Sequence, residues 1–336
     1  MSVRVRSFAK INLGLCIGPS RPDGFHELRT VYQTIALHDF ITVEVTRGSG
    51  IEIRCADPAV PCDSTNTCYQ IVEKALEALD VNTRVVISIE KQIPVQGGLG
   101  GASGNAVAAL IALEQVLKKR LSGPEKLRIA GEVGSDLPLF LVGGTVLGVG
   151  RGEQVFPLPD LPRVACVVAL PEIAVSTPQA FRDWDAEAAL RATGQPGAAV
   201  PTRIESGRDR ITEFSRAVSA WLGVPQHKAG KVLSGVSGIR GGRAGNPLLD
   251  LVRTGIENDF EQVVFPKYPE LREVKGVLVR SGAMYASLSG SGSAVYGLFA
   301  SREKAERAAE RLKKWDVRAV VTTTLGRPQY WAKMLG

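Results

Sequence analysis

A glycine-rich stretch at residues 97–104, Gly-Gly-Leu-Gly-Gly-Ala-Ser-Gly, constrains the fold of this chain more than any other feature of its sequence. It joins a strand pattern at 85–90 to an apolar helix pattern that runs to about residue 119. Glycines at such a junction let backbone N–H groups approach an anion, and the helix N-terminus adds the positive end of its dipole. A tight turn with a serine cap is the plainer alternative, but the density of glycines favours phosphate binding.

Serines accompany the glycines in this loop and in a second cluster. Ser103 is expected to cap the helix or to offer its hydroxyl to a phosphate or to magnesium. No lysine follows the glycines, as a Walker-type loop requires, so the sequence indicates a different phosphate-binding loop. The second cluster, Ser-Gly-Ser-Gly-Ser at 289–293, could by itself be a flexible hairpin turn. Two such clusters in one chain favour a nucleotide that is held by loops from separate halves.

The remaining patterns predict an α+β chain, because strands and helices do not alternate regularly enough for a doubly wound sheet. Alternating apolar residues predict a strand pair at 3–17, a hairpin that joins 41–45 to 51–53, and strands at 295–299 and 317–323. Helices are predicted at 67–79, from the Ser122 cap to Gly134, and from the Ser301 cap over 302–314. The glycine-rich stretch 185–246 is expected to be a mobile loop apart from a helix near 211–222.

The composition limits the class of protein. No apolar run approaches the roughly 18 residues of a membrane-spanning helix, and the N-terminus lacks the apolar core of a secretory signal. Five scattered cysteines argue against a disulfide framework or a zinc site, so we expect a cytoplasmic protein. A formal net charge of +7 suits an anionic small-molecule substrate. Nucleic acid is the weaker interpretation, because no basic run is interleaved with aromatic residues.

Two charged residues could serve phosphoryl transfer. Asp136 is predicted in a turn among apolar neighbours, where its carboxylate could accept the proton of an attacking hydroxyl, although an Asp near a Pro is often an ordinary turn former. Lys10 lies in an otherwise apolar segment, where its charge needs a partner unless its head reaches solvent. Phosphoryl transfer mainly needs positioning and positive charge, so a lysine and an aspartate beside magnesium would suffice.

Three segments together resemble the signature motifs of the GHMP kinase superfamily, in the same order and spacing. They are Phe-Ala-Lys-Ile-Asn-Leu at 8–13, the loop at 94–106, and Ser-Gly-Ser-Gly at 289–292. The resemblance covers nearly the whole chain outside 185–246. It implies an ATP-dependent small-molecule kinase with a two-domain fold and its site in the inter-domain cleft. We expect an N-terminal domain at 1–158 and a C-terminal domain at 159–336, with a flexible insert within 185–246.

Further segments are similar to one branch of that superfamily, which acts on a cytidine-diphosphate-linked methylerythritol. They are Arg-Pro-Asp-Gly-Phe-His-Glu-Leu at 21–28, Thr-Val-Tyr-Gln at 30–33, Gly-Ser-Asp-Leu-Pro-Leu-Phe at 134–140, Gly-Val-Gly-Arg-Gly-Glu at 148–153 and Asn-Asp-Phe-Glu at 258–261. This resemblance implies transfer of the γ-phosphoryl group of ATP, with Mg²⁺, to the 2-hydroxyl of 4-diphosphocytidyl-2-C-methyl-D-erythritol. That reaction belongs to the non-mevalonate pathway of isoprene and terpenoid biosynthesis.

The same resemblance implies the site residues. The expected catalytic residues are Asp136, as the base, and Lys10, as its charged partner, and Ser103 or Asp136 could hold Mg²⁺. The expected ATP-binding residues are Pro94, Gly97, Gly98, Leu99, Gly100, Gly101, Ala102, Ser103, Gly104 and Asn105. The expected substrate-binding residues are Asn12, Phe25, His26, Thr177, Phe181, Ser289, Gly290, Ser291 and Gly292. Within this set, His26 is expected to read the cytosine ring through its backbone, and Phe25 and Phe181 to stack on that ring.

The first loop departs from the superfamily pattern. Gln96 stands where a glycine is common, Ala102 occupies another glycine position, and Gly104 replaces the second of two serines. Two alternatives stay open. One is another GHMP kinase, acting on mevalonate, homoserine or a sugar, against which the Asp-Gly-Phe-His segment at 23–26 argues. The other is a nucleotide-binding regulator without catalysis, against which the retention of Lys10 and Asp136 argues.

Overall fold

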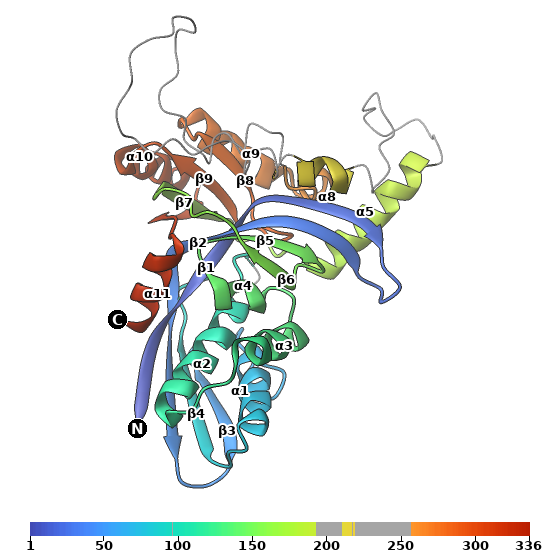
Figure 1. Ribbon diagram of the computed structural model, residues 1–336. Coiled ribbons are helices and arrows are strands. Elements are labelled where there is room, and N and C mark those ends of the chain that lie inside the picture. Colours follow the sequence, from blue (N-terminus) through green and yellow to red (C-terminus); the bar gives the residue numbers. More distant parts are fainter. Residues whose placement is uncertain (96, 193–209, 217, 219–256) are drawn as a thin grey trace, which may run out of the picture.

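The computed structural model describes residues 1–95, 97–192, 210–216, 218 and 257–336, and Figure 1 shows how their elements are arranged. A larger sheet with its helices fills the lower part of that view, and a smaller sheet with its helices fills the upper part. The long strands β1 (Ser2–Ser20) and β2 (His26–Thr46) pass from the lower part to the upper one. These two strands therefore carry side chains to both parts.

The larger sheet is built around β2. Its other strands are β3 (Gly50–Cys55), β4 (Arg84–Glu90), β5 (Thr145–Gly150) and β6 (Gln154–Pro157). The strand order is β3-β4-β2-β5-β6, and β1 pairs with β2 in antiparallel register from Ser2 opposite Glu44 to Ser20 opposite His26. β2 pairs with β4 over 40–46 and with β5 over 28–33. Alternation buries Ile41 and Val43, as expected for a strand with one face toward a core.

Four helices cover this sheet: α1 (Thr67–Ala78), α2 (Gly101–Leu117), α3 (Gly123–Val133) and α4 (Leu137–Val142). All residues of α2 from 104 to 114 are buried, and only Asn105 and Glu114 among them are polar, so this mostly apolar helix is buried on every side. A helix that is apolar on all sides lies inside a core. The N-terminal turn of α2 is therefore held rigidly where the glycine-rich loop enters it.

The smaller sheet is antiparallel, with strand order β10-β7-β9-β8. Its strands are β7 (Ala165–Leu170), β8 (Tyr285–Leu288), β9 (Val295–Phe299) and β10 (Arg318–Thr323). The helices of this part are α5 (Thr177–Ala192), α8 (Glu261–Lys267), α9 (Pro269–Arg280) and α10 (Arg302–Lys313). Buried side chains of α8, α9 and α10 share one core cluster with this sheet.

The last helix, α11 (Arg327–Leu335), returns to the larger sheet. Tyr330 on α11 is fully buried in the core of that part, and its hydroxyl donates to the backbone oxygen of Phe140 at 2.7 Å. Figure 1 shows both termini at the left of the view, the N-terminus at the start of β1 and the C-terminus at the end of α11. We propose domains at 1–158 and 159–336 on the basis of the two sheets, with α11 as a segment of the second that packs on the first.

Several elements predicted from the sequence are confirmed. Helices α1, α3 and α10 lie where their patterns placed them, with Ser122 and Ser301 as N-caps that accept hydrogen bonds from backbone N–H groups. Strands β4, β9 and β10 also lie in the predicted places. The helix near 211–222 is helical over its described residues 210–216, and 185–192 belong to α5 rather than to a loop. The rest of the predicted insert, residues 193–209, 217 and 219–246, lies outside the described residues.

Two strand predictions are wrong. Residues 3–17 form part of one long strand instead of a pair. β2 and β3 do not form a hairpin, because β4 lies between them and β3 pairs with β4 in parallel. Alternating hydrophobicity indicates which residues face a core, but it does not indicate which strand becomes the neighbour.

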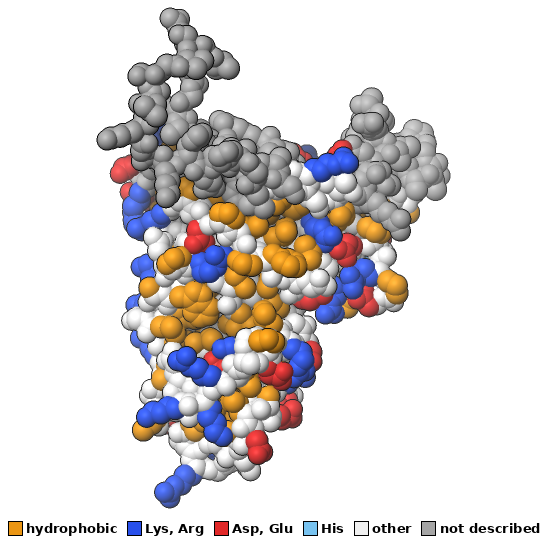
Figure 2. Space-filling view, in the orientation of Figure 1, with side chains coloured by type: hydrophobic (Ala, Val, Ile, Leu, Met, Phe, Trp, Pro, Cys, Tyr) orange, Lys and Arg blue, Asp and Glu red, His pale blue; other side chains and the backbone are white. Residues whose placement is uncertain are grey.

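The surface and the helices also bear on the class of protein. On the described part of the face in Figure 2, Lys and Arg side chains are interspersed with Asp and Glu, and apolar side chains gather near the middle. None of the helices in the described ranges is long and apolar enough to span a membrane.

Candidate active site

The two glycine clusters, far apart in sequence, contact each other directly. The Ser289 hydroxyl donates to the backbone oxygen of Gly98 at 3.0 Å, and the Ala294 N–H donates to that of Gly97 at 3.2 Å. Gly98 has φ +75°, and a Cβ atom built on it would lie 2.0 Å from the Ser289 backbone oxygen. A Cβ on Gly292 would lie 2.3 Å from the Gly98 nitrogen. The two loops can meet this closely only because both positions are glycine.

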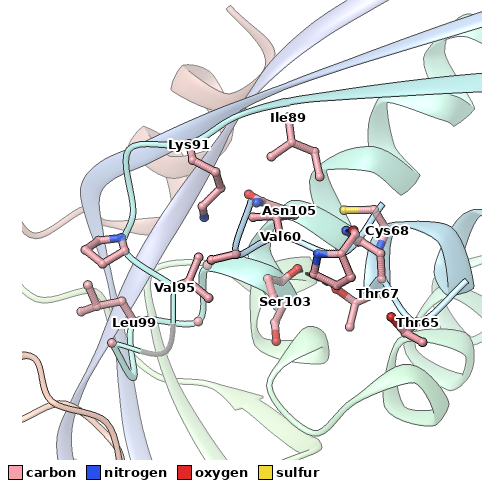
Figure 3. A pocket seen from close by; sticks show the side chains of 18 of the residues that line it. Val60, Thr65, Thr67, Cys68, Ile89, Lys91, Val95, Leu99, Ser103 and Asn105 are labelled. Carbon is pink, nitrogen blue, oxygen red and sulfur yellow. Dashed lines mark hydrogen bonds between the residues drawn. The ribbon is translucent and has the colours of Figure 1, made fainter. Parts of the chain in front are cut away.

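The first loop borders a cavity of about 290 Å³ between α1, β4 and the N-terminus of α2. Figure 3 shows Lys91, Ser103 and Asn105 around this space, with Val60 and Thr67 opposite the loop. All residues predicted to bind ATP line the cavity except Gly104. Gln96 lies outside the described residues.

The helix begins differently from the prediction. Gly100 is its N-cap residue, with φ +69° and ψ +21°, and Ser103 does not cap it: α2 receives no side-chain cap from the described residues. A left-handed N-cap needs glycine, and its lack of a side chain leaves N–H groups of the first turn available. These groups lie beside the cavity, where they and the helix dipole suit an anion. The Ser103 hydroxyl is free of a capping role.

Asp39, which the sequence interpretation missed, fixes both ends of the first loop. Its carboxylate is fully buried and accepts hydrogen bonds from Lys91 Nζ (2.5 Å), from the N–H groups of Gln92 (2.6 Å) and Ile93 (2.8 Å), and from Asn105 Nδ2 (3.0 Å). Asn105 Oδ1 is buried without a partner among the described residues, which leaves one polar acceptor at the cavity. An acidic residue inside the apolar pattern of β2 was the signal that could have identified Asp39.

Gly104 serves packing. A Cβ atom on it would lie 2.9 Å from the Phe8 backbone oxygen and 3.0 Å from Ser7 Oγ, so α2 lies directly on β1 at this point. Position 104 faces β1 and does not line the cavity. The replacement of a serine by Gly104 therefore removes no hydroxyl from the cavity wall.

Lys10, Asn12 and Asp136 lie together beside the two loops. Lys10 is buried, and its Nζ lies 3.3 Å from Asp136 Oδ2 and donates to Asn12 Oδ1 at 2.8 Å. The Lys10 N–H also donates to the Leu99 backbone oxygen at 2.9 Å, which joins β1 to the first loop. A Cβ atom on Gly290 would lie 3.4 Å from both Lys10 Nζ and Asn12 Oδ1. The second loop therefore also reaches this cluster.

The carboxylate of Asp136 is free to take part because it caps no helix. Asp136 is the N-cap residue of α4, but its side chain accepts no capping bond within the described chain. One oxygen contacts Lys10, and the other accepts a hydrogen bond from the Tyr32 hydroxyl at 3.0 Å. The side chain is 33% exposed, so a ligand can reach it. Tyr32 belongs to the Thr-Val-Tyr-Gln segment at 30–33, in which the sequence indicated no role for it.

The aromatic residues are arranged differently from the expectation. The His26 ring stacks on Phe181, with centroids 5.1 Å apart and an interplanar angle of 16°. His26 Nε2 also lies 2.7 Å from Asp185 Oδ1. Phe25 is 50% exposed, and the Arg151 guanidinium lies 4.9 Å from its ring centroid. In this structure Phe181 is therefore paired with the His26 ring, and Phe25 stands apart with Arg151.

The second loop is held by residues from two other elements. Thr177 Oγ1 at the start of α5 lies 2.7 Å from Ser291 Oγ. Asn258 Nδ2 donates to the backbone oxygens of Leu288 (2.9 Å) and Gly290 (2.8 Å). The segment at 258–261 therefore supports the loop, a structural explanation for a motif without an assigned role.

We expect Asn258→Ala to destabilise the protein. The change removes donors from two buried carbonyl groups and the acceptor of the Phe260 N–H, at a cost of about 3 kcal/mol. Urea unfolding would measure this loss, with the exposed Asn82→Ala as the matched control. Equal unfolding free energies for the two variants would contradict the anchoring role.

The comparisons with known proteins agree on a family. The family model described as "GHMP kinases N terminal domain" matches residues 66–144, and "GHMP kinases C terminal" matches 246–317. A protein of Solibacter usitatus (strain Ellin6076), named 4-diphosphocytidyl-2-C-methyl-D-erythritol kinase, is 36% identical over 92% of this chain and 84% of its own length. A protein of the same name from Acaryochloris marina (strain MBIC 11017) is 34% identical over 91% of this chain and 89% of its own length.

Solved structures lead to the same fold. A crystal structure of 4-(cytidine 5'-diphospho)-2C-methyl-D-erythritol kinase has a TM-score of 0.68 and 29% identity, covering 96% of this chain and all of that one. A homoserine kinase from Cytophaga hutchinsonii ATCC 33406 also gives a TM-score of 0.68, covering 98% of this chain and 96% of its own, at 21% identity. The second likeness shows the shared fold alone.

Proposed function

This chain belongs to the 4-diphosphocytidyl-2-C-methyl-D-erythritol kinases, within the GHMP kinases, and from that premise we propose that it transfers the γ-phosphoryl group of ATP to the 2-hydroxyl of 4-diphosphocytidyl-2-C-methyl-D-erythritol. The observation that carries the proposal is the contact of Lys10 Nζ with Asp136 Oδ2, at 3.3 Å, beside two glycine loops that touch each other. This arrangement puts a base and a positive charge next to backbone donors suited to phosphate.

The proposed reaction assigns a role to each part of the site. The 2-hydroxyl oxygen forms a bond to the γ-phosphorus, the bond from that phosphorus to the ADP oxygen breaks, and the hydroxyl proton goes to the Asp136 carboxylate. Lys10 offsets the negative charge on the transferred group, and Asn12 orients the acceptor. The loop N–H groups and the α2 N-terminus hold the other phosphates.

ATP use follows from the kinase family, and we propose that the nucleotide occupies the cavity beside the first loop. Lys91, Ser103 and Asn105 contribute to its polar lining, and Asn105 Oδ1 has no hydrogen-bond partner within the described part of the chain. Cys68 also lines it, but burial raises the pKa of its thiol to about 12, so this group stays uncharged at neutral pH. A thiol of this kind packs rather than reacts.

Magnesium is part of the proposal. Mg²⁺ prefers oxygen ligands, keeps several waters, and is usually held by one or two protein groups together with substrate phosphates. The described residues contain no cluster of three or more His, Cys, Asp or Glu side chains suited to a metal. The Ser103 hydroxyl, which does not cap α2, and the partly exposed Asp136 carboxylate are the candidate ligands for an ion held by only one or two protein groups. The ion would supply positive charge to the phosphates.

The cytidyl end of the substrate is proposed to bind near His26 and Phe181. Thr177 lies at the second loop, so α5 connects that loop to Phe181 one turn further on. The stacking of the His26 ring on Phe181 supports this proposal, because it places a flat ring against Phe181. A cytosine ring between Phe25 and Phe181 would require these side chains to rearrange.

We also propose that the enzyme is located in the cytoplasm. Its five free cysteines support this location.

The direct test is ADP release with magnesium-ATP and four acceptors: the cytidyl-methylerythritol, mevalonate, homoserine and galactose. We expect turnover with the cytidyl compound alone. Turnover with one of the other three instead would reassign the chain to a different GHMP activity. ATP binding without turnover on any acceptor would favour the regulator without catalysis.

A further inference from the structure

The hydrogen bond from Tyr32 to Asp136 has no part in the roles proposed so far. The Tyr32 hydroxyl donates to Oδ1 at 3.0 Å, while Lys10 Nζ lies 3.3 Å from Oδ2. Each carboxylate oxygen is thus held by a different strand, Oδ1 by β2 and Oδ2 by β1. We propose that Tyr32 is a positioning residue that fixes the orientation of the Asp136 carboxylate, an inference that rests on the proposed function.

The segment at 148–153 packs closely against Tyr32. A Cβ atom on Gly148 of β5 would lie 2.5 Å from Tyr32 Cε2, and one on Gly152 would lie 2.5 Å from Tyr32 Oη. The ring therefore lies directly against backbone at both places. This Gly-Val-Gly-Arg-Gly-Glu motif had no role from the sequence, and its glycines leave the space that Tyr32 occupies.

Tyr32 also keeps its proton. Burial, together with the negative charges of Asp136 and Glu153, raises the pKa of this phenol well above its ordinary value of 10. Lys10 Nζ lies 5.5 Å from the ring centroid on the β1 side. Lys10, Asp136 and Glu153 are charged groups near this hydroxyl, which acts as a donor across the working range.

A carboxylate held at both oxygens keeps a fixed direction for its remaining lone pairs. A base must lie within hydrogen-bond reach of the proton that it accepts, and small displacements of a reacting group are costly. Asp136 is 33% exposed and stands at the start of a short helix, where no capping bond restrains its side chain. The Tyr32 hydroxyl supplies the missing restraint.

The variant Tyr32→Phe removes one hydroxyl and keeps the ring. We expect kcat with the cytidyl substrate to fall about tenfold, since a hydrogen bond to a charged group is lost. We expect the KM for ATP to change by less than about twofold, because the lost hydrogen bond stabilises the transition state and does not contribute to ATP binding.

Tyr330→Phe is the matched control, because Tyr330 is equally buried and its hydroxyl donates to a backbone oxygen away from the site. We expect it to lower stability and to leave kcat and the KM for ATP unchanged. If both tyrosine variants lose kcat equally, the effect is general packing and the proposal fails.

A second variant displaces the ring without removing the hydroxyl. Gly148→Ala places a methyl group against Tyr32 in an ordinary strand conformation, and we expect the same fall in kcat with an equally small change in the KM for ATP. Gly131→Ala in α3, with open space around it, controls for the substitution itself. If the wild type is active on the cytidyl substrate and Tyr32→Phe has the same kinetics as the wild type, this inference is overturned and the proposed function is not affected. A wild type inactive on the cytidyl substrate contradicts the proposed function, and this inference with it.

Discussion

Asp136→Asn is expected to lower turnover about a thousandfold while ATP affinity changes little. The asparagine side chain has the same shape, so it can still accept the hydrogen bond from Tyr32, but it cannot take the proton of the attacking hydroxyl. The carboxylate stands beside the glycine loops and makes no hydrogen bond to them in the described chain. ATP binding and phosphoryl transfer should therefore separate in this variant.

Titration calorimetry with a non-hydrolysable ATP analogue and steady-state ADP release would measure the two effects. Asp80→Asn, at an exposed position, is the control for the loss of one charge. Thermal unfolding should also be measured for both variants. Asp136→Asn removes the charged partner of the buried Lys10, so its stability has to be known before its turnover is interpreted. Unchanged turnover in Asp136→Asn would remove this residue from the mechanism.

Gly98→Ala is expected to abolish tight ATP binding, with a dissociation constant raised by about a hundredfold or more. The backbone at Gly98 has φ +75°, which costs a residue with a Cβ atom about 1–2 kcal/mol. The Cβ atom would also lie 2.0 Å from the Ser289 backbone oxygen, so the two loops must separate. Separation would move the backbone N–H groups that we propose as the phosphate site.

Gly97→Ala is the matched comparison. Its added Cβ atom would meet only ordinary contacts, the nearest at 3.7 Å from Leu99 Cδ1, and Gly97 has no positive φ. We expect a loss of only a few-fold for this neighbour. Binding of the same analogue, followed by calorimetry, distinguishes the two, and equal affinities in both variants would contradict the importance of the loop contact.

Much of the local structure could be predicted. The caps Ser122 and Ser301 set the starts of α3 and α10, because a side-chain oxygen that accepts from a nearby N–H acts within one turn. The glycine loop could be placed between β4 and α2, because the strand pattern before it and the helix pattern after it are also local. The exception was Ser103, whose expected capping role was wrong because the left-handed Gly100 occupies the N-cap.

Contacts between distant residues could not be derived from these patterns. Asp39 and Tyr32 were missed because their partners lie on other elements, Asn105 on α2 and Asp136 before α4. The order of β3 and β4 was missed for the same reason, since neighbouring strands are selected by the packing of the whole sheet. The Lys10 and Asp136 pairing came from the resemblance, and the structure brings these two side chains together.

The sequence by itself determined the family, the α+β class, the glycine loops and the helix starts. Each of these depends on neighbours along the chain or on motifs that occur in a recognisable order in the sequence. Only the tertiary structure decided that the two glycine loops touch, that Gly104 packs on β1, and that Tyr32 and Lys10 hold opposite oxygens of Asp136. These features depend on distances between segments that are far apart in the sequence, such as Tyr32 and Asp136 at a separation of 104. Such distances are fixed when buried apolar faces pack, which no local preference specifies.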